Sequence, residues 1–375
     1  MRSLAAVTVL LLATACSGNT GHSPTSPAAS AGAVTSPSGS PSGTPVATSY
    51  GLLLTAGTLE MITPAGTIAA HAKVAAPSVQ SCGQGTGAVL QPPVSASDNK
   101  VYYRDGNTKI KFLTPDGQTG DVTTVPGGAT TVSFFSVSPD DQRIAVMVED
   151  LSPAGTIKLT LYVEDLLGHT NHSVIYTNTV PKLKGNGSTL WPMGWHNGLL
   201  VLGVFAPCTF EPAGLAPIEW HVANAATAVR VAKIGNPCIP SFWPSPSGVA
   251  CIDQSTHQAN VYNWGGSFIS SQPADVADRQ SGLSPGGVSV FFSPGAGIGA
   301  GTPVTHIFTR PSGGPHATVA GHNACLWIDE DHLLAPDAVI GFPSLKVGSS
   351  PGEVPTTIVA LPASGECAGR FPGGL

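Results

Sequence analysis

Residues 58–66 read Thr58-Leu-Glu-Met-Ile-Thr-Pro-Ala-Gly66, and residues 108–117 repeat the pattern as Thr108-Lys-Ile-Lys-Phe-Leu-Thr-Pro-Asp-Gly117. Each stretch alternates apolar and polar residues, which is typical of a β-strand, and then enters a Thr-Pro-x-Gly turn before a second β-like stretch. Similar strands and turns recur at 161–168, 218–224, 260–266, 306–314 and 357–365. The seven copies are spaced by about 50 residues, which indicates an architecture built from repeats.

A second motif alternates with the first and consists of an apolar strand, a tight polar turn and another apolar strand. Its clear copies lie at 94–103, 137–146, 194–202, 243–251, 283–292 and 325–334. The first repeat keeps only the second half of this motif, at residues 50–55. Pro, Asp and Gly supply the backbone conformations that tight turns need. Two hairpins per repeat make four antiparallel strands, the composition of one β-propeller blade.

The composition agrees with an all-β chain and argues against nucleic acid as a partner. The 375 residues include 45 Gly and 34 Pro, the two residue types least compatible with a helix interior. Sixteen Lys and Arg against 22 Asp and Glu leave a formal charge of −6, so no basic surplus is available to neutralise a phosphate backbone.

We therefore predict an all-β chain whose residues 49–375 form a seven-bladed β-propeller of four-stranded antiparallel blades. Six blades is the alternative, because the first repeat lacks a recognisable inner hairpin and ring closure can require a strand from the other terminus. A β-solenoid is a further alternative, although solenoid repeats are normally shorter and more regular. The turns Ser138-Pro-Asp-Asp-Gln-Arg143 and Leu113-Thr-Pro-Asp-Gly117 resemble those of TolB-like and WD-type propellers. That resemblance spans roughly residues 50–375 and implies the fold, not an activity.

The N-terminus predicts export. Residues 1–15 carry Arg2, an apolar run from Leu4 to Leu12 and small residues before Cys16, which is the pattern of a signal peptide. The run is too short to span a bilayer, which needs roughly 20 residues. Leu12-Ala-Thr-Ala-Cys16 resembles the lipobox of bacterial lipoproteins, which implies lipidation of Cys16, with palmitate among the acyl chains, and anchoring to the membrane. An ordinary signal peptide with an unrelated cysteine nearby is the alternative.

Residues 16–48 are expected to form the lipidated cysteine and a disordered tether. Apart from Asn19, His22, Val34 and Val46, residues 17–48 are all Ser, Thr, Pro, Gly or Ala, and none is charged. Such a segment cannot bury enough apolar surface to offset the entropy of ordering. The sequence thus predicts a body held outside the cytoplasm on a lipid anchor.

The remaining six cysteines predict disulfides in an exported domain. Propeller topology favours the pairs Cys208–Cys238 and Cys325–Cys367, because the members of each pair emerge on the same face. Cys82–Cys251 follows by elimination, with Cys251 as a free core thiol the competing interpretation. The closest cysteine spacing is 13 residues, whereas zinc sites place cysteines two to four residues apart, so we expect no metal.

Catalytic and cofactor motifs are not found, and we assign no catalytic, cofactor-binding or metal-binding residue. His169 and His172 are interpreted as loop residues, and Asp329-Glu-Asp331 as a turn rather than a calcium loop. The glycine-rich run 295–301 leads into another strand instead of a helix, so it lacks the helix N-terminus of a dinucleotide site. Paired carboxylates brought together by folding remain an open alternative.

Three tryptophans occupy matching places near the predicted inner turns: Trp195, Trp243 and Trp327. They can stack on a flat ligand such as a sugar at the central channel. Packing between neighbouring blades is the interpretation we favour.

On function, the sequence favours a monomeric, membrane-anchored extracytoplasmic protein without a cofactor, which uses a propeller face to bind a protein or a cell-envelope polymer. An exported enzyme, either a glycan hydrolase or lyase or an oxidoreductase, with a site at the channel is the alternative.

Overall fold

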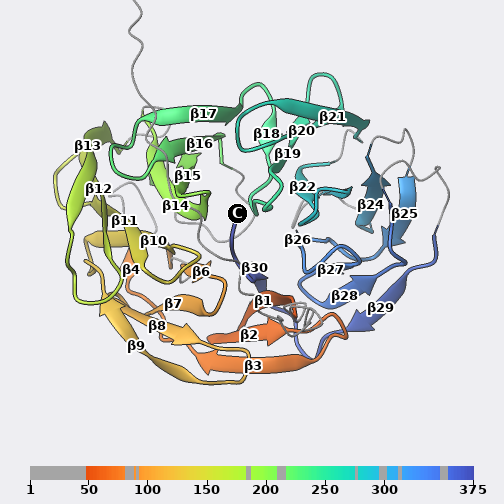
Figure 1. The fold of residues 1–375 in the computed structure, drawn as a ribbon, viewed down its shortest axis with the longest axis horizontal. Coiled ribbons are helices and arrows are strands. Elements are labelled where there is room, and N and C mark those ends of the chain that lie inside the picture. The colour runs from red at the N-terminus through yellow and green to blue at the C-terminus, as the bar shows by residue number, and fades with distance from the viewer. Residues whose placement is uncertain are drawn as a thin grey trace, which may run out of the picture. The chain divides into compact units, whose positions relative to one another are not determined.

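The computed structural model describes residues 48–80, 88–89, 93–182, 187–208, 217–274, 278–294, 302–310, 315–346 and 354–375. Within these residues the chain forms seven four-stranded antiparallel sheets arranged in a ring, and no α-helix (Figure 1). No described segment forms a helix long and apolar enough to span a membrane. The predicted seven-bladed β-propeller is confirmed, and the six-bladed and solenoid alternatives are wrong. The described residues do not include the predicted signal peptide, Cys16 or almost any of the predicted tether.

Each of the seven blades has its innermost strand next to the axis and its outermost strand at the rim. From the inside outward, blade 1 contains β30 (Glu366–Phe371), β1 (Tyr50–Thr55), β2 (Thr58–Ile62) and β3 (Ile68–Lys73). Blade 2 contains β6 (Val94–Ala96), β7 (Val101–Asp105), β8 (Lys109–Leu113) and β9 (Thr119–Thr124). Blade 3 contains β10 (Thr131–Val137), β11 (Arg143–Asp150), β12 (Thr156–Asp165) and β13 (Ser173–Pro181). Blade 4 contains β14 (Thr189–His196), β15 (Leu199–Phe205), β16 (Glu219–Asn224) and β17 (Arg230–Gly235).

The other blades follow the same order. Blade 5 contains β18 (Ile239–Pro240), β19 (Val249–Asp253), β20 (Gln258–Tyr262) and β21 (Phe268–Pro273). Blade 6 contains β22 (Gln280–Leu283), β23 (Ser289–Ser293), β24 (Val304–Thr309) and β25 (Pro315–Ala320). Blade 7 contains β26 (Leu326–Trp327), β27 (His332–Leu334), β28 (Ala338–Gly341) and β29 (Thr357–Ala360). The short strands β4 (Val79–Gln80) and β5 (Ala88–Val89) pair with each other between blades 1 and 2.

Blade 1 closes the ring by combining strands from both ends of the propeller. β30 pairs antiparallel with β1, in a register that runs from Tyr50 opposite Phe371 to Leu54 opposite Glu366. The C-terminal strand therefore supplies the inner strand that the first repeat lacks. Backbone groups on the inner edge of β1 gain partners that they would otherwise not have within the sheet.

The second strands of the blades are among the most buried and the outermost strands are the most exposed, and the sequence of each strand follows its burial. Every residue of β19 and β23 is buried, whereas every residue of β29 is exposed. A second strand is covered on both faces by neighbouring blades, so it reads as a nearly continuous apolar run, as in Ile144-Ala-Val-Met-Val148 of β11.

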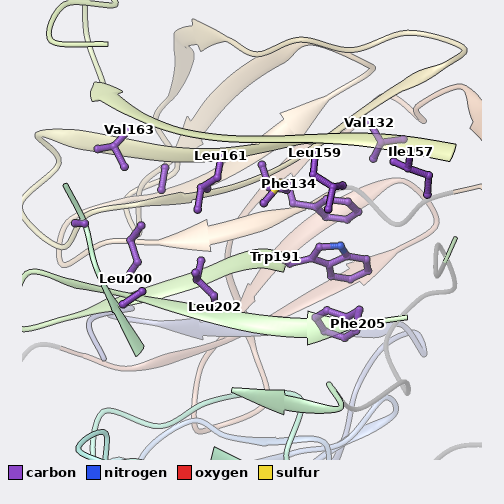
Figure 2. Close-up of a cluster of buried hydrophobic side chains, with 14 of the residues drawn as sticks. Val132, Phe134, Ile157, Leu159, Leu161, Val163, Trp191, Leu200, Leu202 and Phe205 are labelled. Carbon is purple, nitrogen blue, oxygen red and sulfur yellow. The ribbon is translucent and has the colours of Figure 1, made fainter. Parts of the chain in front are cut away.

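The space between blades 3 and 4 shows how large side chains fill the wedge between two sheets. Trp191 of β14 stacks between Phe134 of β10 and Phe205 of β15, with ring centroids 3.9 Å and 4.1 Å away (Figure 2). Leucines 159 and 161 of β12 face leucines 200 and 202 of β15 across the same space (Figure 2). Aromatic stacking of this kind adds to the hydrophobic gain from burial.

Glu149 is a carboxyl group buried beside this cluster. The indole Nε1 of Trp191 donates a 3.3 Å hydrogen bond to its Oε1. Burial raises the pKa of Glu149 from 4.5 to about 7, because the charged form is poorly solvated there, although this bond and one with Thr189 act in the opposite direction.

The Glu149→Gln variant tests whether burying this ionised carboxyl group lowers the stability of the fold. The pKa of Glu149 is higher in the folded protein than in the unfolded chain. The unfolding free energy therefore falls as the pH rises from about 4.5 to about 7 and stays low above that. Glu149→Gln should raise the unfolding free energy by up to about 3 kcal/mol at pH 8 and change it little at pH 4.5, as measured by urea titration. The exposed control Glu366→Gln should change it little at either pH, and an equal gain for Glu149→Gln at both pH values would contradict the explanation.

Two disulfides are described, and they change the predicted pairing. Cys325–Cys367 is confirmed and joins the residue before β26 to β30, so it links blade 7 to the closing strand. Cys238 is bonded to Cys251, with Cα atoms 5.4 Å apart, so the predicted pairs Cys208–Cys238 and Cys82–Cys251 are wrong.

The reason for the correction is the strand register of blade 5. Pro240 lies opposite Cys251 in the β18–β19 ladder, which brings Cys238 beside Cys251. Cys251 is thus not a free thiol. Cys208 is itself disulfide-bonded, and Cys82 lies outside the described residues.

The closing disulfide should be the more stabilising of the two. Its cysteines are 42 residues apart, against 13 for Cys238–Cys251, so it removes more chain entropy from the unfolded state. Replacing Cys325 and Cys367 together by Ser should lower the unfolding free energy by about 4 kcal/mol, compared with about 3 kcal/mol for the matched pair Cys238 and Cys251. If the variant without Cys325 and Cys367 unfolded at the same urea concentration as wild type, this ranking would be wrong.

Candidate functional site

The candidate site lies at the axis, on the face where the chain turns between the first and second strands of each blade. We call this the inner-turn face. The turn in blade 5 is the longest contributor: because β18 has only two residues, residues 241–248 form an extended connection, which we call the axial loop. It carries Trp243, one of the tryptophans singled out from the sequence.

The axial loop is held by hydrogen bonds within blade 5 and to blade 6. The indole of Trp264 donates to the carbonyl of Ser245, at 2.9 Å. The Ser245 hydroxyl donates to the carbonyl of Ser284, at 2.8 Å, and the Ser247 hydroxyl donates to that of Pro285, at 2.5 Å. Since these bonds fix the backbone on both sides of Pro246, the loop is a rigid part of the propeller.

Trp243 reaches from blade 5 to the opposite part of the ring. It is partly buried against the cluster between blades 7 and 1, which includes Leu53 and Leu326. Its closest aromatic neighbour is Phe242, whose ring centroid is 4.7 Å away in an edge-to-face arrangement. Gly369 of β30 has a φ of 126°, which favours glycine, and a Cβ at this position would contact the Trp243 ring.

The last residues of the chain also cross the axis on this face, and Figure 1 marks the C-terminus at the centre of the ring. The backbone N–H of Gly373 donates to the carbonyl of Ser97 in blade 2, at 2.9 Å. That of Leu375 donates to the carbonyl of Trp195 in blade 4, at 3.1 Å. This segment and the axial loop together fill much of the centre of the face.

Two small cavities remain beside the axial loop. The first, of about 40 Å³, is lined by the axial loop, by the inner strands of blades 6 and 7 and by β30. The second, of about 60 Å³, lies between the axial loop, β30, blade 2 and the C-terminal residues. Trp243, Pro244, Gly369 and Arg370 line both. The single ionisable side chain among the described lining residues is that of Arg370.

Arg370 gives this site its charge. Burial lowers the pKa of its guanidinium to about 10, while the nearby carboxylates of Glu330 and Asp329 act in the opposite direction. The side chain is therefore positively charged at neutral pH.

The acidic turn of blade 7 borders the site, and its side chains are engaged in local hydrogen bonds. Glu330 accepts hydrogen bonds from the Ser284 hydroxyl, at 2.8 Å, and from the backbone N–H of Gly286. Asp329 is bonded to Nδ1 of His332 at 2.8 Å, and this bond raises the pKa of His332. No group of carboxylates, histidines and cysteines able to hold a metal ion occurs in the described part of the chain.

Of the three predicted stacking tryptophans, Trp243 and Trp327 line the same cavity, whereas Trp195 lines neither. Trp195 is 2% exposed and donates to the carbonyl of Ser136 in the neighbouring blade, with the Arg143 guanidinium 4.8 Å from its ring centroid. Trp327 is 4% exposed and packs against Phe291 and Phe342, although one edge lines the first cavity. Trp243 alone of the three lines both cavities.

The other sequence candidates have local roles or lie outside the described residues. His169 and His172 both bond to the buried carboxylate of Glu164, at 2.8 Å and 2.7 Å. The glycine-rich run 295–301 falls outside the described residues. Arg370, which sequence reasoning missed, follows Gly369 in a strand with no recognisable motif, so only its position in the fold reveals it.

Fold and site together define a disulfide-bonded propeller with a narrow, largely apolar axial site around one arginine. No protein-family model matches the chain, and no curated protein matches it significantly in sequence.

Among solved structures, the chain is similar to a chain of the mitotic checkpoint complex, with 13% identity and a TM-score of 0.46, covering 74% of this chain and 82% of that one. It is also similar to oligogalacturonate lyase in complex with manganese, with 12% identity, a TM-score of 0.46 and coverage of 81% and 83%. BamB from Moraxella catarrhalis matches with 12% identity, a TM-score of 0.40 and coverage of 88% and 84%. Likeness at this level bears on the fold alone.

Replacing Trp195 and Trp243 by alanine should distinguish a tryptophan packed between blades from one that is partly exposed at the axis. Trp195→Ala should lower the unfolding free energy by about 3–5 kcal/mol, because it empties a fully buried space between blades. Trp243→Ala should cost clearly less, since part of its ring faces the cavities. Equal losses in urea-induced unfolding would show that Trp243 is a core residue like Trp195.

Proposed function

We propose that the protein is a lipoprotein anchored through Cys16 outside the cytoplasm, whose propeller binds a cell-envelope polymer or protein through the inner-turn face. Disulfides in the propeller indicate folding in an oxidising, extracytoplasmic compartment. The lipobox-like residues 12–16 and the uncharged segment after them support an anchor and a tether.

The observation that carries the binding role is the construction of the axial site. Trp243 is presented on a loop fixed by hydrogen bonds, beside a charged arginine and two cavities. A rigid aromatic side chain next to a charged group is a common arrangement for recognition.

The alternative of an exported enzyme receives less support from this geometry. Glycoside hydrolysis needs two carboxyl groups roughly 5–10 Å apart on either side of the scissile bond. No described side chain that lines the two cavities carries a carboxylate. Of the hydroxyls there, Ser245 donates to a main-chain carbonyl and Ser95 accepts from the main-chain N–H of Val137.

Changing Cys16→Ala tests the anchor. The variant should be released into the medium or fail to mature, and it should lose labelling by radioactive palmitate, because the acylated thiol is absent. Ser17→Ala is the matched control and should remain in the membrane fraction. Membrane retention of Cys16→Ala would contradict the proposal.

Binding is tested with the released protein. It should co-sediment saturably with insoluble cell-envelope fragments of the producing cells, and Trp243→Ala should reduce the bound amount at wild-type levels of folded protein. Sedimentation of wild type and Trp243→Ala to the same extent would remove the axial site from the proposed function.

A further inference from the structure

Arg370 is a charged side chain whose hydrogen-bond donors have no acceptor within the described residues, although Glu330 and Asp329 lie near enough to attract it. Within the described chain, no carbonyl, carboxylate or hydroxyl accepts a hydrogen bond from its guanidinium, and it forms no ion pair. Removing a cation from water without pairing it is unfavourable. The side chain of Arg370 is half-buried, so its guanidinium is partly withdrawn from water and keeps donors that no described protein group uses.

Other arginines of the propeller do have partners. Arg104, which is more deeply buried than Arg370, donates a 2.6 Å hydrogen bond to the carbonyl of Ser133. Arg310 donates through Nε to the carbonyl of Gly287, and Arg279 donates to that of Asp278 at 2.8 Å. Arg370 differs because it lines both cavities and no described protein group accepts a hydrogen bond from its guanidinium.

The nearby acidic residues are held in their own interactions. Glu330 is bonded to Ser284 and Gly286 and also attracts Arg310, and Asp329 is bonded to His332. Each carboxylate thus has hydrogen-bond partners of its own in addition to its attraction to Arg370. They maintain the charge of the guanidinium and leave its hydrogen-bond donors available.

Cavity size limits what can reach Arg370. Volumes of about 40 and 60 Å³ correspond to about three to five water molecules. A pendant carboxylate is planar, has few heavy atoms and matches the fork of N–H groups on a guanidinium. A phosphodiester in a polymer backbone carries a chain on both sides, so it cannot enter so small a space.

We propose that Arg370 binds the carboxylate of a uronic acid residue in an acidic envelope polysaccharide, with the sugar ring against Trp243. The lining also includes Pro244 and Pro285, which offer apolar surface beside Trp243. This assignment rests on the proposed binding function and names its ligand class.

The test uses the mature protein released by Cys16→Ala and glucuronate-containing hexasaccharides, with calorimetry and tryptophan fluorescence as readouts. Wild type should bind the hexasaccharide saturably and bind its methyl ester at least tenfold more weakly, because the ester has no charge. Arg370→Gln should also bind the acid at least tenfold more weakly. The matched control Arg230→Gln, a rim arginine of β17, should bind like wild type.

Separate titrations with acetate and inorganic phosphate identify the source of the anion. Acetate or phosphate binding as tight as that of the hexasaccharide would overturn the polysaccharide assignment. Equal binding of acid and ester, equal binding by Arg370→Gln and wild type, or no binding by wild type would overturn the proposal as a whole.

Stability distinguishes this role from a structural one. Arg370→Gln loses no hydrogen bond or ion pair to the described residues, so its melting temperature should stay close to that of wild type. A marked fall would mean that Arg370 serves the fold, which would overturn the proposal. Envelope co-sedimentation that persists without uronate binding would refute only the ligand class and leave the broader binding function standing.

Discussion

The pairing of β30 with β1 is the constraint on which the rest of the propeller depends. Six blades are each formed from a continuous stretch of chain, but blade 1 exists only when residues from both ends of the propeller meet. Blades pack on two neighbours, so the ring holds its shape only when it is closed. Cys325–Cys367 strengthens the same junction, since it ties the inner strand of blade 1 to the start of blade 7.

Closure also positions the candidate site. The strand that completes blade 1 carries Gly369 and Arg370, and the residues after it cross the axis toward blade 4. Trp243 comes from the far side of the ring and approaches this strand at Gly369. A site made from parts so distant in sequence exists only in the closed ring.

Much of the fold was predictable because alternating strands and Pro, Asp or Gly turns are local signals. Blade number followed from the turns near Gly66 and Gly117 and their later counterparts. The closing strand was harder to predict, since Glu-Cys-Ala-Gly-Arg-Phe has no clear alternation. Cys238–Cys251 depended on a ladder of only two residue pairs, and the importance of Arg370 depends on burial and missing partners, which no local pattern records.

The disulfide Cys238–Cys251 has a consequence for how the axial loop presents Trp243. Since β18 contributes only two ladder pairs, the covalent bond secures the loop where the strands hold it weakly. Most of the conformational entropy of the loop is then lost during folding and not when a ligand arrives. Preorganisation of this kind lets a small contact area contribute more fully to affinity. It also means that breaking this disulfide alone would loosen the loop, and so weaken recognition, while Cys325–Cys367 still held the ring closed.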